Sequence, residues 1–169
     1  MTPNPNTNDV LIADDDVDDY MMFEMAIQEI AVPVSLRHAK DGEMLFQKLK
    51  EAIPHLLFLD IQMPCKDGIA CILEIRKDPR YNYLPVIMYT SFNHRPYIED
   101  SYKNGANYYM IKPQTIKALR EKLEIIFEKQ WHMQLYFPPM HEFVMSWSSL
   151  LLTVADVGMS LTIFVPAKN

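Results

Sequence analysis

The segment LLFLD, residues 56–60, decides the fold. A short apolar run without alternation is typical of a strand that is buried on both faces, as in a parallel sheet. In open α/β sheets, ligands bind beyond the carboxyl ends of the strands, which is where Asp60 would lie. The segment therefore predicts a buried parallel strand with Asp60 at the functional edge of the sheet.

Two other segments of the chain end in charged side chains in the same way. VLIA at residues 10–13 leads into the acidic run at residues 14–16, and YYMI at residues 108–111 leads into Lys112. If the three strands are parallel neighbours, their carboxyl ends share one edge of the sheet. Several carboxylates and one lysine would then converge there.

Strand-like segments alternate with helix-like segments from residue 9 to about residue 130, which implies a parallel sheet with helices on both faces. The predicted strands are residues 10–13, 34–38, 56–60, 86–90 and 108–111. Right-handed crossovers limit the topology to a doubly wound sheet. We expect an α/β fold with a five-stranded parallel sheet in the flavodoxin-like order 2-1-3-4-5.

The segment after the first strand is predicted to be a helix. Asp16 can cap its N-terminus, and Val17, Met21 and Met25 recur at helical spacing. The many methionines of the chain are interpreted as core residues.

The composition limits the classes of protein to which the chain can belong. With 49% hydrophobic and 22% charged residues, the chain is globular. Its net charge is -6 and it has no basic run, which argues against a nucleic-acid binder. Cys65 and Cys71 match no common zinc or redox spacing, and no signal peptide precedes them, so we expect a reducing cytoplasmic location.

The acidic cluster predicts a metal-assisted reaction. Carboxylates held together repel one another, and a hard divalent cation such as Mg²⁺ relieves the repulsion. Lys112 can pair with a carboxylate and then with a phosphoryl oxygen, to which the Thr90 hydroxyl can also donate. This set of groups suits phosphoryl transfer to a carboxylate.

Five motifs, in matching order and spacing, make the chain resemble the receiver domains of bacterial two-component response regulators over residues 9–130. The motifs are VLIADDD (10–16), LDIQMP (59–64) with Gly68, VIMYTS (86–91), Gly105-Ala106 and YMIKP (109–113). The resemblance implies a single-domain signalling protein of the chemotaxis-regulator type. Such a protein catalyses only its own phosphorylation and dephosphorylation.

The resemblance also implies a role for each site residue. Asp60 would accept the phosphoryl group from a histidine kinase or phosphotransfer protein, and Thr90 and Lys112 would hold it. Magnesium would be bound by Asp15, Asp60 and the backbone carbonyl of Gln62, with Asp14 acting through water. Tyr109 would move with Thr90, and the fourth helix, fifth strand and fifth helix would bind a downstream protein. A cis peptide bond between Lys112 and Pro113 is implied as well.

Three other functions use a similar fold or motif. A flavin-binding electron carrier needs a glycine- and hydroxyl-rich loop after the first strand, whereas residues 14–16 would repel a phosphate. A haloacid-dehalogenase-type phosphatase needs a second aspartate two residues after Asp60, where this chain has Gln62. A phosphorylation-independent, receiver-like binding module remains the principal alternative.

The two ends of the chain are expected to lie outside the 9–130 domain. Residues 1–8 are interpreted as a disordered lead-in, and residues 131–169 as an extension of uncertain structure. Residues 146–165 are apolar enough to suggest a membrane helix, but Asp156 near the centre would cost about 2.5–3.5 kcal/mol there. A hairpin between residues 150–154 and 161–165, or an irregular packed tail, is therefore favoured over a membrane segment, and such a tail could pair across a homodimer.

Overall fold

The computed structural model describes residues 7–129, 131 and 137–145, and it contains one five-stranded sheet. All neighbouring strands are parallel, in the order β2-β1-β3-β4-β5, so the predicted topology is confirmed. The strands are β1 (Asn8–Ala13), β2 (Val34–Ala39), β3 (Leu56–Leu59), β4 (Val86–Thr90) and β5 (Tyr108–Ile111).

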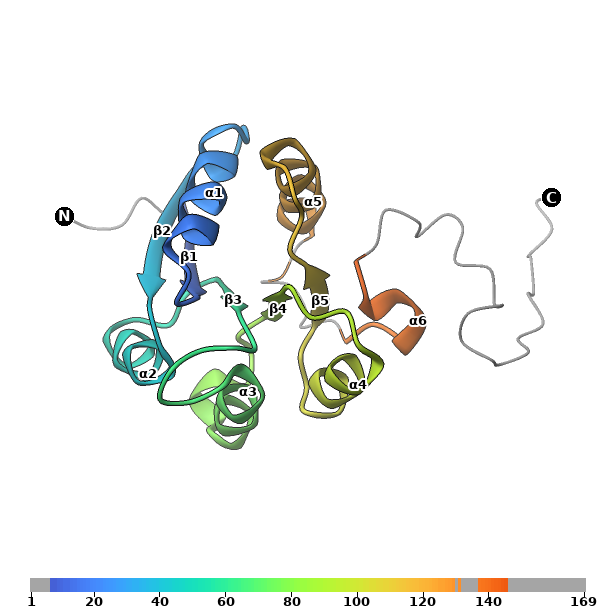
Figure 1. The fold of residues 1–169 in the computed structure, drawn as a ribbon. Coiled ribbons are helices and arrows are strands. Elements are labelled where there is room, and N and C mark those ends of the chain that lie inside the picture. Colours follow the sequence, from blue (N-terminus) through green and yellow to red (C-terminus); the bar gives the residue numbers. More distant parts are fainter. Residues whose placement is uncertain (1–6, 130, 132–136, 146–169) are drawn as a thin grey trace, which may run out of the picture.

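Helices cover both faces of the sheet (Figure 1). α1 (Val17–Gln28) and α5 (Ile116–Glu128) pack side by side on one face. The opposite face carries α2 (Gly42–Glu51), α3 (Gly68–Lys77), the short 3-10 helix η1 (Pro79–Tyr81) and α4 (Arg95–Lys103). Each face has its own cluster of buried apolar side chains, because alternate residues of the buried strands point to opposite sides.

Asp16 caps α1 as predicted, since its carboxylate accepts hydrogen bonds from the backbone N–H groups of Asp18 and Asp19. The interpretation of the methionines as core residues is wrong for Met21 and Met25, whereas Met22 packs against the core. Met21 and Met25 are about half exposed, at 53% and 50%, and the buried face carries Phe23 and Ala26 instead. The helix has apolar side chains on two faces, and the face that carries the aromatic ring packs on the sheet.

The strand register aligns the functional edge. Ala13 pairs with Leu59, and the Asp60 N–H donates to the Ala13 carbonyl at 2.9 Å. Thr90 pairs with Ile111, and the next N–H, that of Lys112, donates to the Thr90 carbonyl at 2.8 Å. The residues that follow β1, β3 and β5 therefore lie together at the carboxyl ends of the strands.

The described part of the C-terminal extension returns to the sheet. α6 (Met140–Phe143) lies beside α4 and β5, and Val144 forms a parallel bridge with Tyr109. The predicted hairpin falls outside the described residues, as does most of the predicted lead-in, whose last residue, Asn8, begins β1. Among the described residues, no helix combines the length and apolar character that a bilayer crossing requires.

Candidate functional site

The site is centred on the Lys112 ammonium group. Its Nζ lies 2.8 Å from Asp14 Oδ2, 2.8 Å from Asp19 Oδ2 and 2.9 Å from Asp60 Oδ2. Lys112, Asp14 and Asp60 are all buried. The ends of three strands contribute Asp14, Asp60 and Lys112 to a single cluster, as predicted, and α1 adds Asp19.

Burial and pairing act against each other at Lys112. Burial alone would lower the pKa of the ammonium group. The carboxylates of Asp60 and Asp14 and the hydrogen bond to Asp19 outweigh burial, so the pKa is raised above its usual value. Lys112 therefore stays charged and supplies a fixed positive charge beside Asp60.

Asp14 is the most strongly desolvated carboxylate of the cluster. Burial raises its pKa to about 6, although the hydrogen bond and the charge of Lys112 oppose the shift. Its other oxygen accepts a hydrogen bond from the Asp16 N–H at 3.1 Å. Additional positive charge at the site would stabilise the ionised form of Asp14.

Both oxygens of the Asp60 carboxylate accept hydrogen bonds. Oδ1 accepts from the Ile61 N–H at 2.6 Å and, at 3.4 Å, from the Gln62 N–H, while Oδ2 accepts from Lys112. These bonds fix the orientation of the carboxylate at the end of β3. A fixed, paired carboxylate at the sheet edge is suited to act as a nucleophile.

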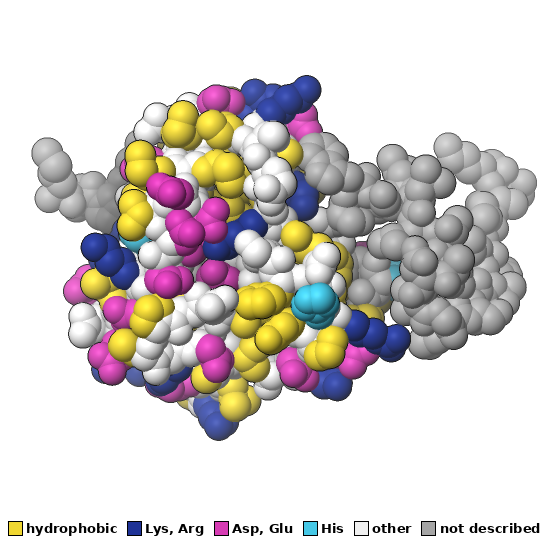
Figure 2. Space-filling model, viewed as in Figure 1, with side chains coloured by type: hydrophobic (Ala, Val, Ile, Leu, Met, Phe, Trp, Pro, Cys, Tyr) yellow, Lys and Arg dark blue, Asp and Glu magenta, His cyan; other side chains and the backbone are white. Residues whose placement is uncertain are grey.

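Asp14, Asp15 and Asp60 can each offer one carboxylate oxygen, and the three oxygens lie within 4.8 Å of one another. Hard oxygen ligands of this kind fit Mg²⁺, which keeps several of its waters. Asp15 is exposed, so the set opens to solvent, and acidic side chains gather in the middle of the face shown in Figure 2. Participation of the Gln62 carbonyl stays a prediction.

Thr90 and Tyr109 lie on the two strands beyond β3. Thr90 is buried at the end of β4, and its Oγ1 accepts a hydrogen bond from the Phe92 N–H at 3.5 Å. Tyr109 is also fully buried, and its hydroxyl donates to the Phe92 carbonyl at 2.8 Å. Phe92 thus connects Thr90 and Tyr109, the two residues that are predicted to move together on phosphorylation.

A family model described as the response regulator receiver domain matches residues 10–124. The chain belongs to this family. It is 32% identical over 116 residues to chemotaxis protein CheY of Pseudomonas aeruginosa, covering 67% of this chain and 94% of that protein. It is 31% identical to CheY-3 of Vibrio cholerae, covering 67% and 89%.

Solved structures show the same fold. A putative response regulator from Chloroflexus aurantiacus is 26% identical with a TM-score of 0.64, covering 73% of this chain and 99% of that one. The Mn(2+)-bound form of response regulator Rcp1 is 23% identical with a TM-score of 0.66, covering 78% and 99%. The fold class and the receiver resemblance are therefore confirmed.

This receiver also uses Asp19, which the sequence analysis did not include in the site. The sequence did carry a signal, because a cap at Asp16 places residue 19 in the first turn of α1, next to the acidic loop. Its carboxylate reaches Lys112 across 93 residues of sequence, and such a long-range pairing is invisible in a local pattern.

The implied cis bond before Pro113 is absent, because the described residues contain no cis peptide bond. The cis and trans forms of a bond before proline differ by only about 0.5–1 kcal/mol, so the surrounding structure decides between them. Lys112 reaches all three carboxylates with a trans bond.

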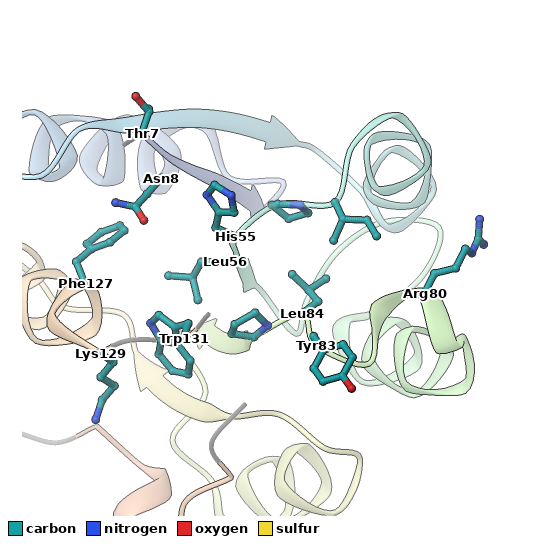
Figure 3. A pocket seen from close by; sticks show the side chains of 13 residues that line it. Thr7, Asn8, His55, Leu56, Arg80, Tyr83, Leu84, Phe127, Lys129 and Trp131 are labelled. Carbon is teal, nitrogen blue, oxygen red and sulfur yellow. The ribbon is translucent and has the colours of Figure 1, made fainter. Parts of the chain in front are cut away.

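A cavity of about 740 Å³ lies at the other end of the sheet (Figure 3). It is lined by the first residues of β1 and β3 and by Phe127, Lys129 and Trp131. Strands of a parallel sheet all begin at one edge and end at the other, so this cavity is remote from Asp60. The cavity is therefore separate from the cluster of Lys112 and its three carboxylates.

Proposed function

We propose that this receiver accepts a phosphoryl group on Asp60 from a phosphohistidine of a sensor histidine kinase or phosphotransfer protein and thereby changes a face that binds a downstream protein. The observation that carries the proposal is the contact of Lys112 with Asp60 and with two further carboxylates at the ends of the strands. In this proposal the protein is a cytoplasmic signalling component that catalyses only its own phosphorylation and dephosphorylation.

In the transfer step, a carboxylate oxygen of Asp60 attacks the phosphorus atom. A P–O bond forms as the P–N bond to the histidine breaks, and the histidine nitrogen keeps the electron pair. The bonds from Ile61 and Lys112 hold the attacking carboxylate in one orientation, which reduces the entropy lost on reaching the transition state.

Lys112 neutralises charge that develops on the transferring group. Because its ammonium is shared among three carboxylates, it can turn from Asp60 to a phosphoryl oxygen without losing Asp14 and Asp19. The buried Thr90 hydroxyl, at the end of β4 between β3 and β5, would donate to the same phosphoryl group. Asp14, Asp15 and Asp60 would hold Mg²⁺, which would supply further positive charge to the phosphoryl oxygens.

The exposed stripe of α1 supports a protein as the phosphoryl donor. Val17, Met21 and Met25 are each at least half exposed, at 54%, 53% and 50%. Val17 begins the helix directly after the acidic run, and hydrophobic side chains border the acidic group in Figure 2. An apolar stripe beside a phosphoacceptor would fit the apolar face of a helical partner, since such partners dock through residues at i, i+4 and i+8 spacing.

The proposal is tested by incubating the full chain with Mg²⁺ and acetyl phosphate and measuring its intact mass. We expect a gain of one phosphoryl group that is absent from Asp60→Asn and from samples with a chelator. Asp67→Asn is the matched control, because Asp67 is an exposed aspartate that only caps α3. A parent protein that gains no mass would contradict the proposal and favour a phosphorylation-independent binding module.

A further inference from the structure

Residues 137–145, here called the C-terminal cover, lie on the face formed by α4, β5 and α5 (Figure 1). Phe143 is the anchor of this contact and is completely buried. Its ring lies 5.1 Å from that of Tyr102 on α4 and 6.1 Å from that of Tyr109 on β5, measured between centroids. The cover therefore contributes a residue to the core of the domain.

The backbone of the cover continues the sheet beyond β5. The Met145 N–H donates to the Tyr109 carbonyl at 2.8 Å, next to the parallel bridge between Val144 and Tyr109. Val144 packs against the core cluster on one face of the sheet and Met145 against the cluster on the other. This alternation is that of a strand, so the cover occupies an edge on which another chain could pair.

Lys122 on α5 holds the end of the cover. Its Nζ donates to the Met145 carbonyl at 2.9 Å and, at 3.4 Å, to the Ile111 carbonyl of β5. The side chain is 8% exposed, so its charge depends on these acceptors for compensation. All three elements of the face, α4, β5 and α5, thus contact the cover.

The cover also contacts the residue that leads back to the phosphorylation site. Tyr109 lies between Phe143 and the Phe92 carbonyl, and Phe92 is bonded in turn to the Thr90 hydroxyl. A displacement of Thr90 therefore moves Phe92, whose carbonyl accepts the hydrogen bond from the Tyr109 hydroxyl. In this structure Tyr109 packs against Phe143 while the Asp60 carboxylate is bonded to Lys112.

We propose that the C-terminal cover is an autoinhibitory segment that occupies the α4–β5–α5 face and the free edge of β5, and that phosphorylation of Asp60 loosens it. This inference rests on the proposed function for the phosphorylation step. A closely packed contact such as that of Phe143 tolerates little displacement, so a shift of Tyr109 weakens the cover. Release exposes the β5 edge and the ring of Tyr102 that Phe143 covers to a partner protein.

The test is hydrogen exchange of the full chain, read by mass spectrometry in the peptide that contains the Met145 amide. Without a phosphoryl donor, we expect this peptide to exchange at least tenfold more slowly in the parent than in Phe143→Ser. Lys122→Met is the second variant, because it removes the ammonium group that donates to the Met145 carbonyl and leaves both Phe143 and the Met145 amide in place. It should also exchange faster than the parent. Met140→Ser, at a 37% exposed position of α6, is the control and should exchange like the parent.

Acetyl phosphate and Mg²⁺ should then speed the exchange of this peptide in the parent and leave Asp60→Asn unchanged. The intact mass of the same samples separates the two possible failures. No phosphoryl gain would overturn the proposed function, and with it the coupling. A full phosphoryl gain with unchanged exchange would overturn the coupling alone. Rapid exchange of the parent before any treatment would overturn the cover itself.

Discussion

At the scale of single residues, Lys112 organises the site because one buried ammonium group compensates three carboxylates. Ionised Asp14 is still disfavoured, since burial is the largest influence on its pKa. Ionised Asp14 thus lowers the free energy of unfolding, at a position where its carboxylate would help to bind a cation. Residues that serve function rather than folding are expected to show this trade-off.

The pKa of Asp14 leads to a prediction about stability and pH. Its pKa is about 6 in the folded protein, against an ordinary value of 3.8, so between these values the folded state binds more protons than the unfolded state. The contribution of Asp14 to the free energy of unfolding therefore falls as pH rises from about 4 to 6. Asp14→Asn should be more stable than the parent at pH 7, by on the order of 2–3 kcal/mol, and equal to it near pH 4.

Urea unfolding at a series of pH values, in the presence of a chelator, measures this difference. Asp16→Asn is the control, because asparagine caps a helix about as well as aspartate does. A less stable Asp14→Asn variant at pH 7 would show that the bond to Lys112 outweighs the burial of Asp14.

At the scale of elements, helix caps were predictable and the buried face of α1 was not. Asp16 caps α1 as its position after a strand indicated. Both apolar stripes of α1 have helical spacing, so periodicity alone cannot tell which one faces the sheet. Packing decides in favour of Phe23, whose ring contacts those of Phe58 and Tyr89 edge to face.

This assignment of the two stripes predicts unequal mutational effects. Met21→Lys should change the free energy of unfolding by less than about 0.5 kcal/mol, because the side chain is half exposed. Phe23→Ala should lower it by about 3–5 kcal/mol, because it leaves a cavity between α1 and the sheet. Chemical unfolding of both variants decides between the two faces, and similar losses would mean that Met21 is buried as well.

The β3–α3 connection depends on the small size of Gly68. A Cβ atom there would overlap the Asp60 carbonyl oxygen and lie 2.9 Å from the Ile61 Cα. Gly68→Ala should therefore displace the phosphoacceptor loop and cost about 1–3 kcal/mol in stability. It should also slow phosphorylation by acetyl phosphate, as measured by intact mass over time. Leu73→Ala, at an exposed position of the same helix, should phosphorylate at the parent rate.

At the scale of the whole molecule, the alternation of strands and helices was sufficient to predict the sheet order and the convergence of Asp14, Asp60 and Lys112. The contact between residues 137–145 and β5 could not be predicted, because no local pattern in that segment identifies its partner strand. The left-handed backbone of Cys65, with φ of 66°, was equally hidden, since the residue is neither glycine nor asparagine.

Arg76 on α3 forms hydrogen bonds to three residues outside its own helix. Its guanidinium donates to the carbonyls of Gly105 and Tyr81 and to the Asn107 side chain. Arg76→Met should lower the free energy of unfolding by roughly 2–4 kcal/mol, because several buried acceptors lose a charged donor. Phosphorylation at a temperature well below the unfolding transition should persist.

Thermal unfolding and intact mass measure the two effects separately, with exposed Lys77→Met as the control. An Arg76→Met variant that folds with parental stability would show that the three bonds add nothing to the fold. Loss of phosphorylation in a folded variant would instead link this region to the site.

Chemical mapping of the acyl phosphate bond tests most directly whether Asp60 carries the phosphoryl group. Borohydride reduces an aspartyl phosphate to homoserine, which peptide mass spectrometry locates in the sequence. After treatment with acetyl phosphate and Mg²⁺, we predict homoserine at position 60 and none at positions 14, 15 or 19. Homoserine at one of those positions, or at none of the four, would contradict the account.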